Sequence, residues 1–312
     1  MFCLSRKSQL FVSAAVLFAL TASAAKSQES TPPRQVRLTI TVRDKSGRYV
    51  SSLRKDQITV FDEKIPQELV FFQEEKSVPA SIGFVLDISK LKLGNLLSGS
   101  TQEVRQFMAA SGPANEYFMI AFDNKPYIAN DFTQDRNQIV AAFAALAKAS
   151  SSKKTALYDA ARLGIEKVKA GRNPKHVLLL ISDDRDSASN LKRSELIDLL
   201  RESDVLLYAI RITTPGSNNL HSIVLDELCS TTGGIALYPA STAEFMDAFE
   251  MLALELQHQY SAAFSPSSIS KAAGWHHLEF NVKPLELKSL SSKEVKNIPL
   301  FARSREGYYF GP

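Results

Sequence analysis

The chain has 312 residues, of which 45% are hydrophobic and 22% are charged, a composition typical of globular proteins and not of disordered ones. Its formal net charge of +4 falls to +2 if the first 25 residues, which carry Arg6 and Lys7, are removed. A charge so near neutrality gives no reason to expect binding to nucleic acid or to a membrane surface.

The N-terminus has the layout of a secretory signal peptide. Arg6 and Lys7 form a basic start, residues 10–20 are an apolar run, and residues 22–24 are the small residues of a cleavage site. The apolar run is too short to span a bilayer comfortably, and an uncleaved anchor is the alternative. We therefore predict a signal peptide over residues 1–25 and an exported chain, periplasmic or extracellular, with no transmembrane span after maturation.

The two cysteines give no disulfide in the mature chain. Cys3 lies in the predicted signal peptide, so cleavage leaves Cys229. No sequence feature near Cys229 would activate a nucleophile, and we predict that it is a buried structural thiol.

The sequence pattern of residues 34–78 predicts an N-terminal β segment. Polar and apolar residues alternate over 36–42 and 58–61, and residues 69–72 offer a third strand. Alternation predicts antiparallel strands with one buried face.

Residues 79–258 change character and predict an α/β domain. Four apolar runs lack alternation, as parallel strands buried on both faces do: 82–86, 117–122, 177–181 and 205–210. Shorter strands are expected over 126–131 and 235–238. Helical patterns cover 96–110, 135–147, 156–169, 194–202 and 242–257. The alternation of strands and helices predicts a doubly wound, mostly parallel, Rossmann-like sheet with helices on both faces.

The tail, residues 259–312, returns to β-forming patterns. We expect strands over 259–264, 277–282, 295–301 and 304–310. Because chain termini often lie close together, we predict that this C-terminal segment packs with the N-terminal strands as one antiparallel β unit beside the α/β domain.

Polar residues follow two of the buried strands and begin one helix. Asp87 and Ser89 follow the first strand, Thr155 begins the helix over 156–169, and Asp183 follows the third strand. Ligands of open α/β sheets bind beyond the carboxyl ends of the strands, and hydroxyls with carboxylates suit a hard cation such as Mg²⁺. Each residue also has a structural explanation, since aspartates satisfy loop amides and Thr155 could be the N-cap of its helix.

These residues carry a resemblance to a known family. The order D-x-S at 87–89, T-A-L-Y-D-A at 155–160 and S-D at 182–183 resembles the von Willebrand factor A family with its metal-ion-dependent adhesion site. The wider chain looks like a branch of secreted bacterial proteins with a VWFA-related domain, seen largely in acidobacteria. The segments that resemble those flanking the domain in that branch are 60–64, 259–260 and 305–309.

The resemblance implies a role for each site residue. Ser89 and Thr155 would contact Mg²⁺, or Mn²⁺ or Ca²⁺ in its place, directly, and Asp87 and Asp183 would hold it through water. An open coordination position would accept an acidic residue from a protein partner.

The chain departs from the family pattern D-x-S-x-S. Leu91 stands at its last position and cannot coordinate a metal, and Lys90 adds a cation close by. Asp184 stands where the family usually has glycine. These departures predict a degenerate metal site.

Enzymatic motifs are missing from the sequence. It has no G-x-S-x-G elbow, no Walker loop and no H-E-x-x-H helix. His276 and His277 are neighbours on a predicted strand, so their side chains point to opposite faces and cannot share a metal. We predict a non-enzymatic protein-binding or adhesion module with a partner protein that the sequence does not identify. The alternatives are a metal-independent interaction scaffold and a hydrolase with an unrecognised site.

Overall fold

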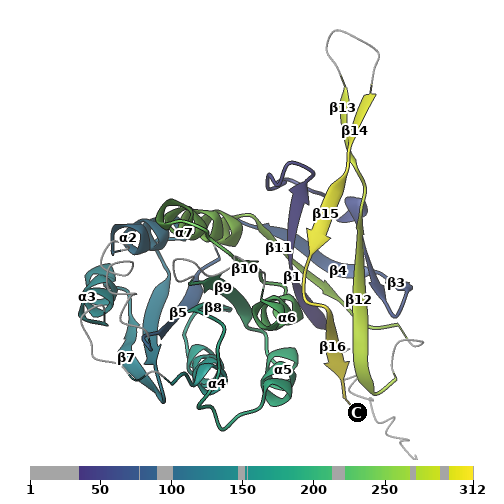
Figure 1. The fold of residues 1–312 in the computed structure, drawn as a ribbon. Coiled ribbons are helices and arrows are strands. Elements are labelled where there is room, and N and C mark those ends of the chain that lie inside the picture. Colours follow the sequence, from purple (N-terminus) through teal and green to yellow (C-terminus); the bar gives the residue numbers. More distant parts are fainter. Residues whose placement is uncertain are drawn as a thin grey trace, which may run out of the picture. The chain divides into compact units, whose positions relative to one another are not determined.

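A six-stranded sheet forms the centre of the α/β part (Figure 1). Its order is β10-β9-β8-β5-β6-β7, and neighbouring strands are parallel except for β6 and β7. The strands are β5 (Ala80–Asp87), β6 (Glu116–Phe122), β7 (Pro126–Thr133), β8 (Lys175–Ser182), β9 (Leu206–Arg211) and β10 (Ala236–Leu237). Every residue of β5 and β6 is buried, as the unbroken apolar runs predicted.

The computed structural model describes residues 35–76, 78–89, 101–146, 152, 154–212, 222–267, 272–288 and 295–311. The predicted signal peptide, residues 1–25, lies outside the described residues, and so do Lys90 and Leu91. Among the helices of the described part, none is both long and apolar enough to cross a membrane.

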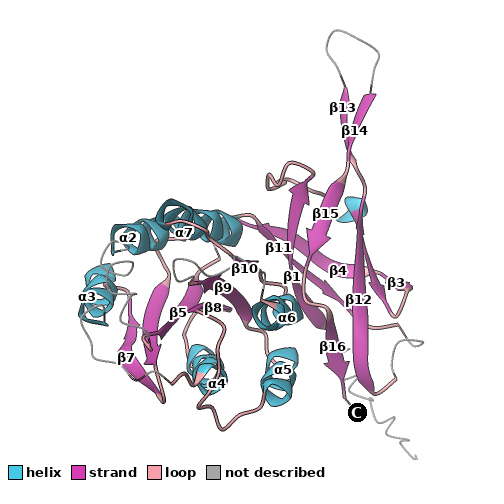
Figure 2. Ribbon diagram, in the orientation of Figure 1, coloured by secondary structure: helices cyan, strands magenta, loops and turns pink. Residues whose placement is uncertain are grey.

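Helices cover both faces of the central sheet (Figure 2). One face carries α2 (Thr101–Ala110), α3 (Arg136–Leu146) and α7 (Thr242–Gln257), and the other carries α4 (Leu157–Val168), α5 (Arg193–Arg201) and α6 (Ile223–Thr232). Phe84 packs in the first layer and its neighbour Val85 in the second, because successive side chains of a strand point to opposite faces. Gly83 lets the Phe118 ring approach, since a Cβ there would lie 2.2 Å from it. The predicted α/β class, with a mostly parallel Rossmann-like sheet, is confirmed.

The N- and C-terminal segments share two antiparallel sheets. The first sheet has the order β15-β1-β11-β4, and the second has the order β16-β12-β2-β3. Their strands are β1 (Val36–Asp44), β2 (Ile58–Asp62), β3 (Ile65–Gln67), β4 (Leu69–Glu75), β11 (Gln259–Phe264), β12 (Gly274–Val282), β15 (Leu300–Arg303) and β16 (Gly307–Phe310). Apolar side chains from both sheets, Ile40, Val60 and Phe264 among them, form one core. We refer to these two sheets as the β unit.

The strand predicted over 295–301 is wrong in its extent. The structure divides it into β14 (Val295–Ile298) and β15, with Pro299 between them. Proline has no N–H to donate to a neighbouring strand, so it ends one ladder before the next begins. β14 pairs instead with β13 (Leu285–Lys288), a short strand that the sequence pattern did not predict.

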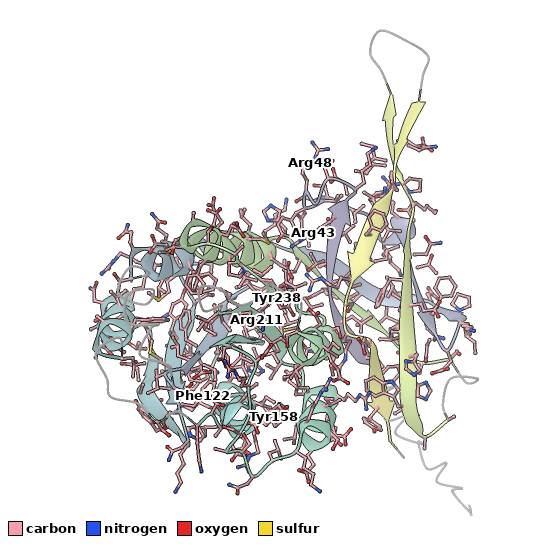
Figure 3. All side chains as sticks on the ribbon, viewed as in Figure 1. Arg43, Arg48, Phe122, Tyr158, Arg211 and Tyr238 are labelled. Atoms are coloured by element: carbon pink, nitrogen blue, oxygen red, sulfur yellow. The ribbon has the colours of Figure 1, made fainter. Side chains whose placement is uncertain are left out.

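Buried ion pairs connect the β unit to the α/β part. Glu255 of α7 is fully buried and pairs with Arg43 of β1, at 2.7 Å, and with Arg303 of β15. Figure 3 shows Arg43 on its strand. Lys175 of β8 pairs with Glu75 of β4 at 2.7 Å, and both side chains are buried. Side chains from both the N-terminal and the C-terminal segment thus form ion pairs with the α/β part.

Candidate functional site

Asp87 is the last residue of β5 and is only 2% exposed. Its Oδ1 accepts a hydrogen bond from the Ser89 N–H, and its Oδ2 accepts one from the Ser182 hydroxyl at the end of β8, each at 2.9 Å. Burial raises the pKa of Asp87, hydrogen bonds from Ser89 and Ser182 lower it, and the nearby charge of Asp183 raises it again, with a net upward shift. The carboxylate is therefore fixed at the carboxyl end of the sheet.

Hydrogen bonds connect the loops around this edge of the sheet. The Ile88 N–H donates to the Phe122 carbonyl at 2.9 Å, and the Ala156 N–H donates to the carbonyl of the next residue, Asp123, at 2.6 Å. The Thr155 carbonyl in turn accepts from the Ser187 N–H at 2.8 Å. Figure 3 labels Phe122 and, in α4, Tyr158. The loops that carry Asp87, Ser89, Thr155 and Asp183 therefore adjoin one another, and we call these four residues the carboxyl-end site.

Thr155 is buried but does not cap its helix. The N-cap of α4 is Ala156, which makes no side-chain capping hydrogen bond. The Thr155 N–H donates to the Ser187 hydroxyl at 3.1 Å, and the two hydroxyl oxygens are 3.4 Å apart. The structural explanation of Thr155 as an N-cap is wrong, because the amides of the loop after β8 hold its carbonyl outside the helix.

The Ser89 hydroxyl is the strongest indication of a ligand. It is buried, and its oxygen makes no well-formed hydrogen bond among the residues that the structure describes, although it interacts with the Asp87 carboxylate and lowers the pKa of that group. A buried hydroxyl without a well-formed hydrogen bond is costly and uncommon in native structures. A cation coordinated by this oxygen would remove that cost, so Ser89 fits the direct metal contact that the resemblance implies.

Asp183 and Asp184 already have cationic partners. Arg185 lies 3.2 Å from Asp183, and Arg211, at the end of β9, lies 3.2 Å from Asp184 (Figure 3). Both distances run from a guanidinium Nε to a carboxylate oxygen. These arginines place positive charge where a divalent cation would need negative charge. The residues therefore fit a metal only in part.

Asp184, which stands where the resemblance leads us to expect glycine, has a backbone conformation that favours glycine. Its φ is 71°, in the left-handed region that favours glycine, and its N–H donates to the Ser182 hydroxyl at 3.3 Å. The turn after β8 thus has a left-handed residue whose side chain forms the ion pair with Arg211. Asp159, in the T-A-L-Y-D-A motif, accepts the N–H groups of Asn190 and Leu191 at 2.9 and 3.0 Å and holds this loop in place.

Away from this edge of the sheet, the described residues form neither a second metal-binding cluster nor a site around the cysteine. Over the described ranges, no three His, Cys, Asp or Glu side chains come together so as to hold a metal ion. Cys229 is buried, and burial raises the pKa of its thiol, as expected of a structural cysteine. His276 is buried and faces Asp62, whereas its neighbour His277 is exposed, which agrees with opposite orientations on a strand.

Solved structures resemble more than half of the chain. Proximal thread matrix protein 1 from the mussel byssus is 17% identical, with a TM-score of 0.50 over 63% of this chain and 51% of its own. In another structure of that protein (16% identity, TM-score 0.48, 63% and 50% coverage) zinc occupies the metal-ion-dependent adhesion motif. The von Willebrand factor domain of the type V pilus tip protein from Porphyromonas gingivalis is 11% identical, with a TM-score of 0.42 over 57% of this chain and 95% of its own.

The likeness to the mussel protein at a TM-score of 0.50 shows the fold alone, and this chain spans about half the length of that protein. None of the curated proteins matches the chain in sequence. The family model of the von Willebrand factor type A domain matches residues 82–247, which is more than half of the chain. This match runs from within β5 to within α7 and includes all four residues of the carboxyl-end site. The chain therefore belongs to the von Willebrand factor type A domain family.

Proposed function

We propose that this protein is an exported, non-enzymatic binding or adhesion module that contacts a partner protein through the carboxyl-end site, and that its metal site is degenerate. The observation that carries the proposal is the ion pair that Asp183 makes with Arg185. The charge of Asp183 acts on nearby Asp87, as the charges of two carboxylates in one metal site would, yet Arg185 pairs with Asp183. Mg²⁺, Mn²⁺ or Ca²⁺ would therefore bind weakly or not at all.

The alternative is a metal-independent interaction scaffold. The hydrogen bonds that Asp87 accepts from Ser89 and Ser182 favour it, because they satisfy both carboxylate oxygens without a metal. In this alternative the site residues only shape the loops of a protein-binding edge.

Titration calorimetry with Mg²⁺ distinguishes the degenerate metal site from the metal-independent scaffold. Leu91→Ser with Lys90→Gly restores a hydroxyl and removes a cation, and we expect the double variant to bind Mg²⁺ at least about tenfold more tightly than the natural protein, since hard-ion affinity depends on oxygen ligands and charge. Adding Asp183→Ala should abolish the gain. The matched control, Leu93→Ser with Lys92→Gly, should have no effect.

Two results would contradict the degenerate site. If the natural protein binds Mg²⁺ with micromolar affinity, the site is intact. If neither the natural protein nor the double variant responds to Mg²⁺, the metal-independent scaffold is the correct alternative.

The exported location and the secreted bacterial branch of VWFA-related proteins are part of the same proposal. The basic start, apolar run and small residues over 1–25 support them. N-terminal sequencing of the protein from its native host should give a start near residue 25. A mature chain that still begins at Met1 and stays in the cytoplasm would rule out export.

A further inference from the structure

A cavity of about 600 Å³ lies at the other end of the central sheet from the carboxyl-end site. The first residues of two parallel strands, Lys175 of β8 and Leu206 of β9, line one side of it. Thr39, Phe71 and Ser261 of the first sheet of the β unit line the other. Its volume is within the range of small-molecule sites in proteins, about 300–1,000 Å³.

Large apolar side chains at this cavity are exposed. Val70 is 52% exposed, Phe71 45% and Val78 38%, and all three line the cavity. The pairing of β4 with β11 skips Val70, since Ala263 pairs with Phe71 and Phe264 with Leu69. Such a bulge re-aims side chains. An apolar ligand would remove this surface from water, which is favourable in proportion to the area covered.

Four charged or titratable groups of the lining are already paired with one another. Lys175 pairs with Glu75 at 2.7 Å and also donates to the Leu256 carbonyl at 3.1 Å. His176 lies 3.2 Å from Asp204. Each carboxylate of the lining, that of Glu75 and that of Asp204, therefore already has a basic partner.

Two arginines of the lining have no carboxylate partner within the described part of the chain. The Arg305 guanidinium donates to three backbone carbonyls, those of Arg201, Ser203 and Gly307. Because a guanidinium has five N–H groups, two remain for other acceptors. Burial lowers the pKa of Arg305, and the nearby charge of Asp204 opposes this shift. Arg37 is exposed and makes no ion pair with any described residue.

We propose that this cavity binds an amphipathic carboxylate, a small molecule with an apolar body and one carboxylate group. The apolar body lies against Val70, Phe71 and Val78, and the carboxylate pairs with Arg305 and Arg37. Guanidinium groups bind carboxylates with two parallel hydrogen bonds, which supplies both charge and geometry. This site is separate from the carboxyl-end site and does not depend on the function proposed for it.

Calorimetry with octanoate and with octan-1-ol, which has the same chain without the charge, tests the proposal. We expect octanoate to bind at least about tenfold more tightly than octan-1-ol. Phe71→Ser should weaken both ligands by about tenfold, because the apolar contact is lost. Arg37→Gln should weaken octanoate alone, by about fivefold, as an exposed ion pair would.

Matched controls fix the location. Tyr127→Ser removes an aromatic side chain that is also 45% exposed but lies on β7, and Arg48→Gln removes an arginine that pairs with Asp44. Neither should change octanoate binding. If Phe71→Ser fails to fold, Val78→Ser takes its place.

Three results would overturn the proposal. One is the absence of saturable octanoate binding up to about 1 mM. Another is equal affinity for octanoate and octan-1-ol, which removes the role of the carboxylate. The third is a loss of binding in Tyr127→Ser as large as that in Phe71→Ser.

Discussion

Arg185 places a positive charge directly against Asp183 of the carboxyl-end site. Its N–H donates to Asp183 Oδ1 at 3.3 Å, while its guanidinium Nε lies 3.2 Å from Asp183 Oδ2. The Arg185 side chain is 65% exposed, whereas that of Asp183 is 12% exposed. An exposed cation therefore neutralises a mostly buried carboxylate, and this pairing competes with any metal ion for Asp183.

Replacing this cation should favour metal binding. We expect Arg185→Gln to raise the affinity for Mg²⁺ by about fivefold, the amount by which one exposed ion pair stabilises Asp183 without metal. Titration calorimetry measures the change. Arg54→Gln, at an arginine that is 71% exposed and pairs with Asp56, should leave Mg²⁺ binding as it is in the natural protein. An affinity that is unchanged in Arg185→Gln would show that Asp183 takes no part in binding the metal.

The position of the site could be predicted from the sequence, but its charge pairing could not. Asp87 and Asp183 each follow an apolar run, and the carboxyl ends of parallel strands meet at one edge, so their proximity follows from the pattern. The ion pair of Asp184 with Arg211 depends on β9 lying beside β8 and on the left-handed backbone at Asp184. No spacing in the sequence encodes either fact.

Among the strands, the second sheet of the β unit has a buried titratable network. His276 of β12 contacts Asp62 of β2 at 2.9 Å and the Ala272 carbonyl at 2.7 Å. The Tyr308 hydroxyl of β16 donates to the other Asp62 oxygen at 2.7 Å. Burial lowers the pKa of His276, but the hydrogen bonds to Ala272 and Asp62 outweigh it, and the pKa is raised above its ordinary value of 6.5. Three strands are thus held together best when His276 is protonated.

The sign of the pH effect follows from this shift. A raised pKa in the folded state means that the protonated form contributes stability below pH 6.5, and that this contribution is lost as the pH rises through the folded-state pKa. We expect the free energy of unfolding of the natural protein to exceed that of His276→Gln by a margin that is full below about pH 6.5 and shrinks as the pH rises above it. Urea melts at several pH values measure it. His277→Gln, at the exposed neighbour, should show a constant difference, and a constant difference for His276→Gln would contradict the network's role.

The elements that the sequence predicted well are those with long, regular patterns. The helix predicted over 242–257 coincides with α7, and the strand over 259–264 coincides with β11. Short strands such as β3 and β13 were missed, because three or four residues hold too little alternation to be told from a loop. The division of one predicted strand into β14 and β15 at Pro299 was not predicted, although proline interrupts strands. The residues on both sides of Pro299 favour β structure, and they gave a single continuous pattern.

For the molecule as a whole, Glu255 is the anchor between the β unit and the α/β part. Arg43 and Arg303 reach it from two strands of the first sheet, and the Tyr49 hydroxyl lies 3.3 Å from its Oε2. Removing one member of a buried ion pair leaves the other charges uncompensated. The division into segments 34–78, 79–258 and 259–312 stays a prediction, and this anchor offers a way to test it.

Glu255→Gln should uncouple the two parts. We expect it to lower the free energy of unfolding by about 3 kcal/mol. The fluorescence of Trp275 in β12, the protein's single tryptophan, should then change at lower denaturant than the circular dichroism of the helices. In the natural protein the two transitions should coincide. Glu250→Gln, at an exposed position of α7, is the control. Coincident and unshifted transitions in Glu255→Gln would show that the anchor is dispensable.

The pairing of N-terminal strands with C-terminal strands constrains the order in which the sheets can form during synthesis of the chain. β1 pairs with β11 and β15, and β2 pairs with β12, so neither completes its sheet until these later strands have been synthesised. The central sheet and its helices, by contrast, are contiguous in the chain from β5 to α7. The first strands to be synthesised, β1 and β2, therefore cannot pair fully until β11, β12 and β15 are available.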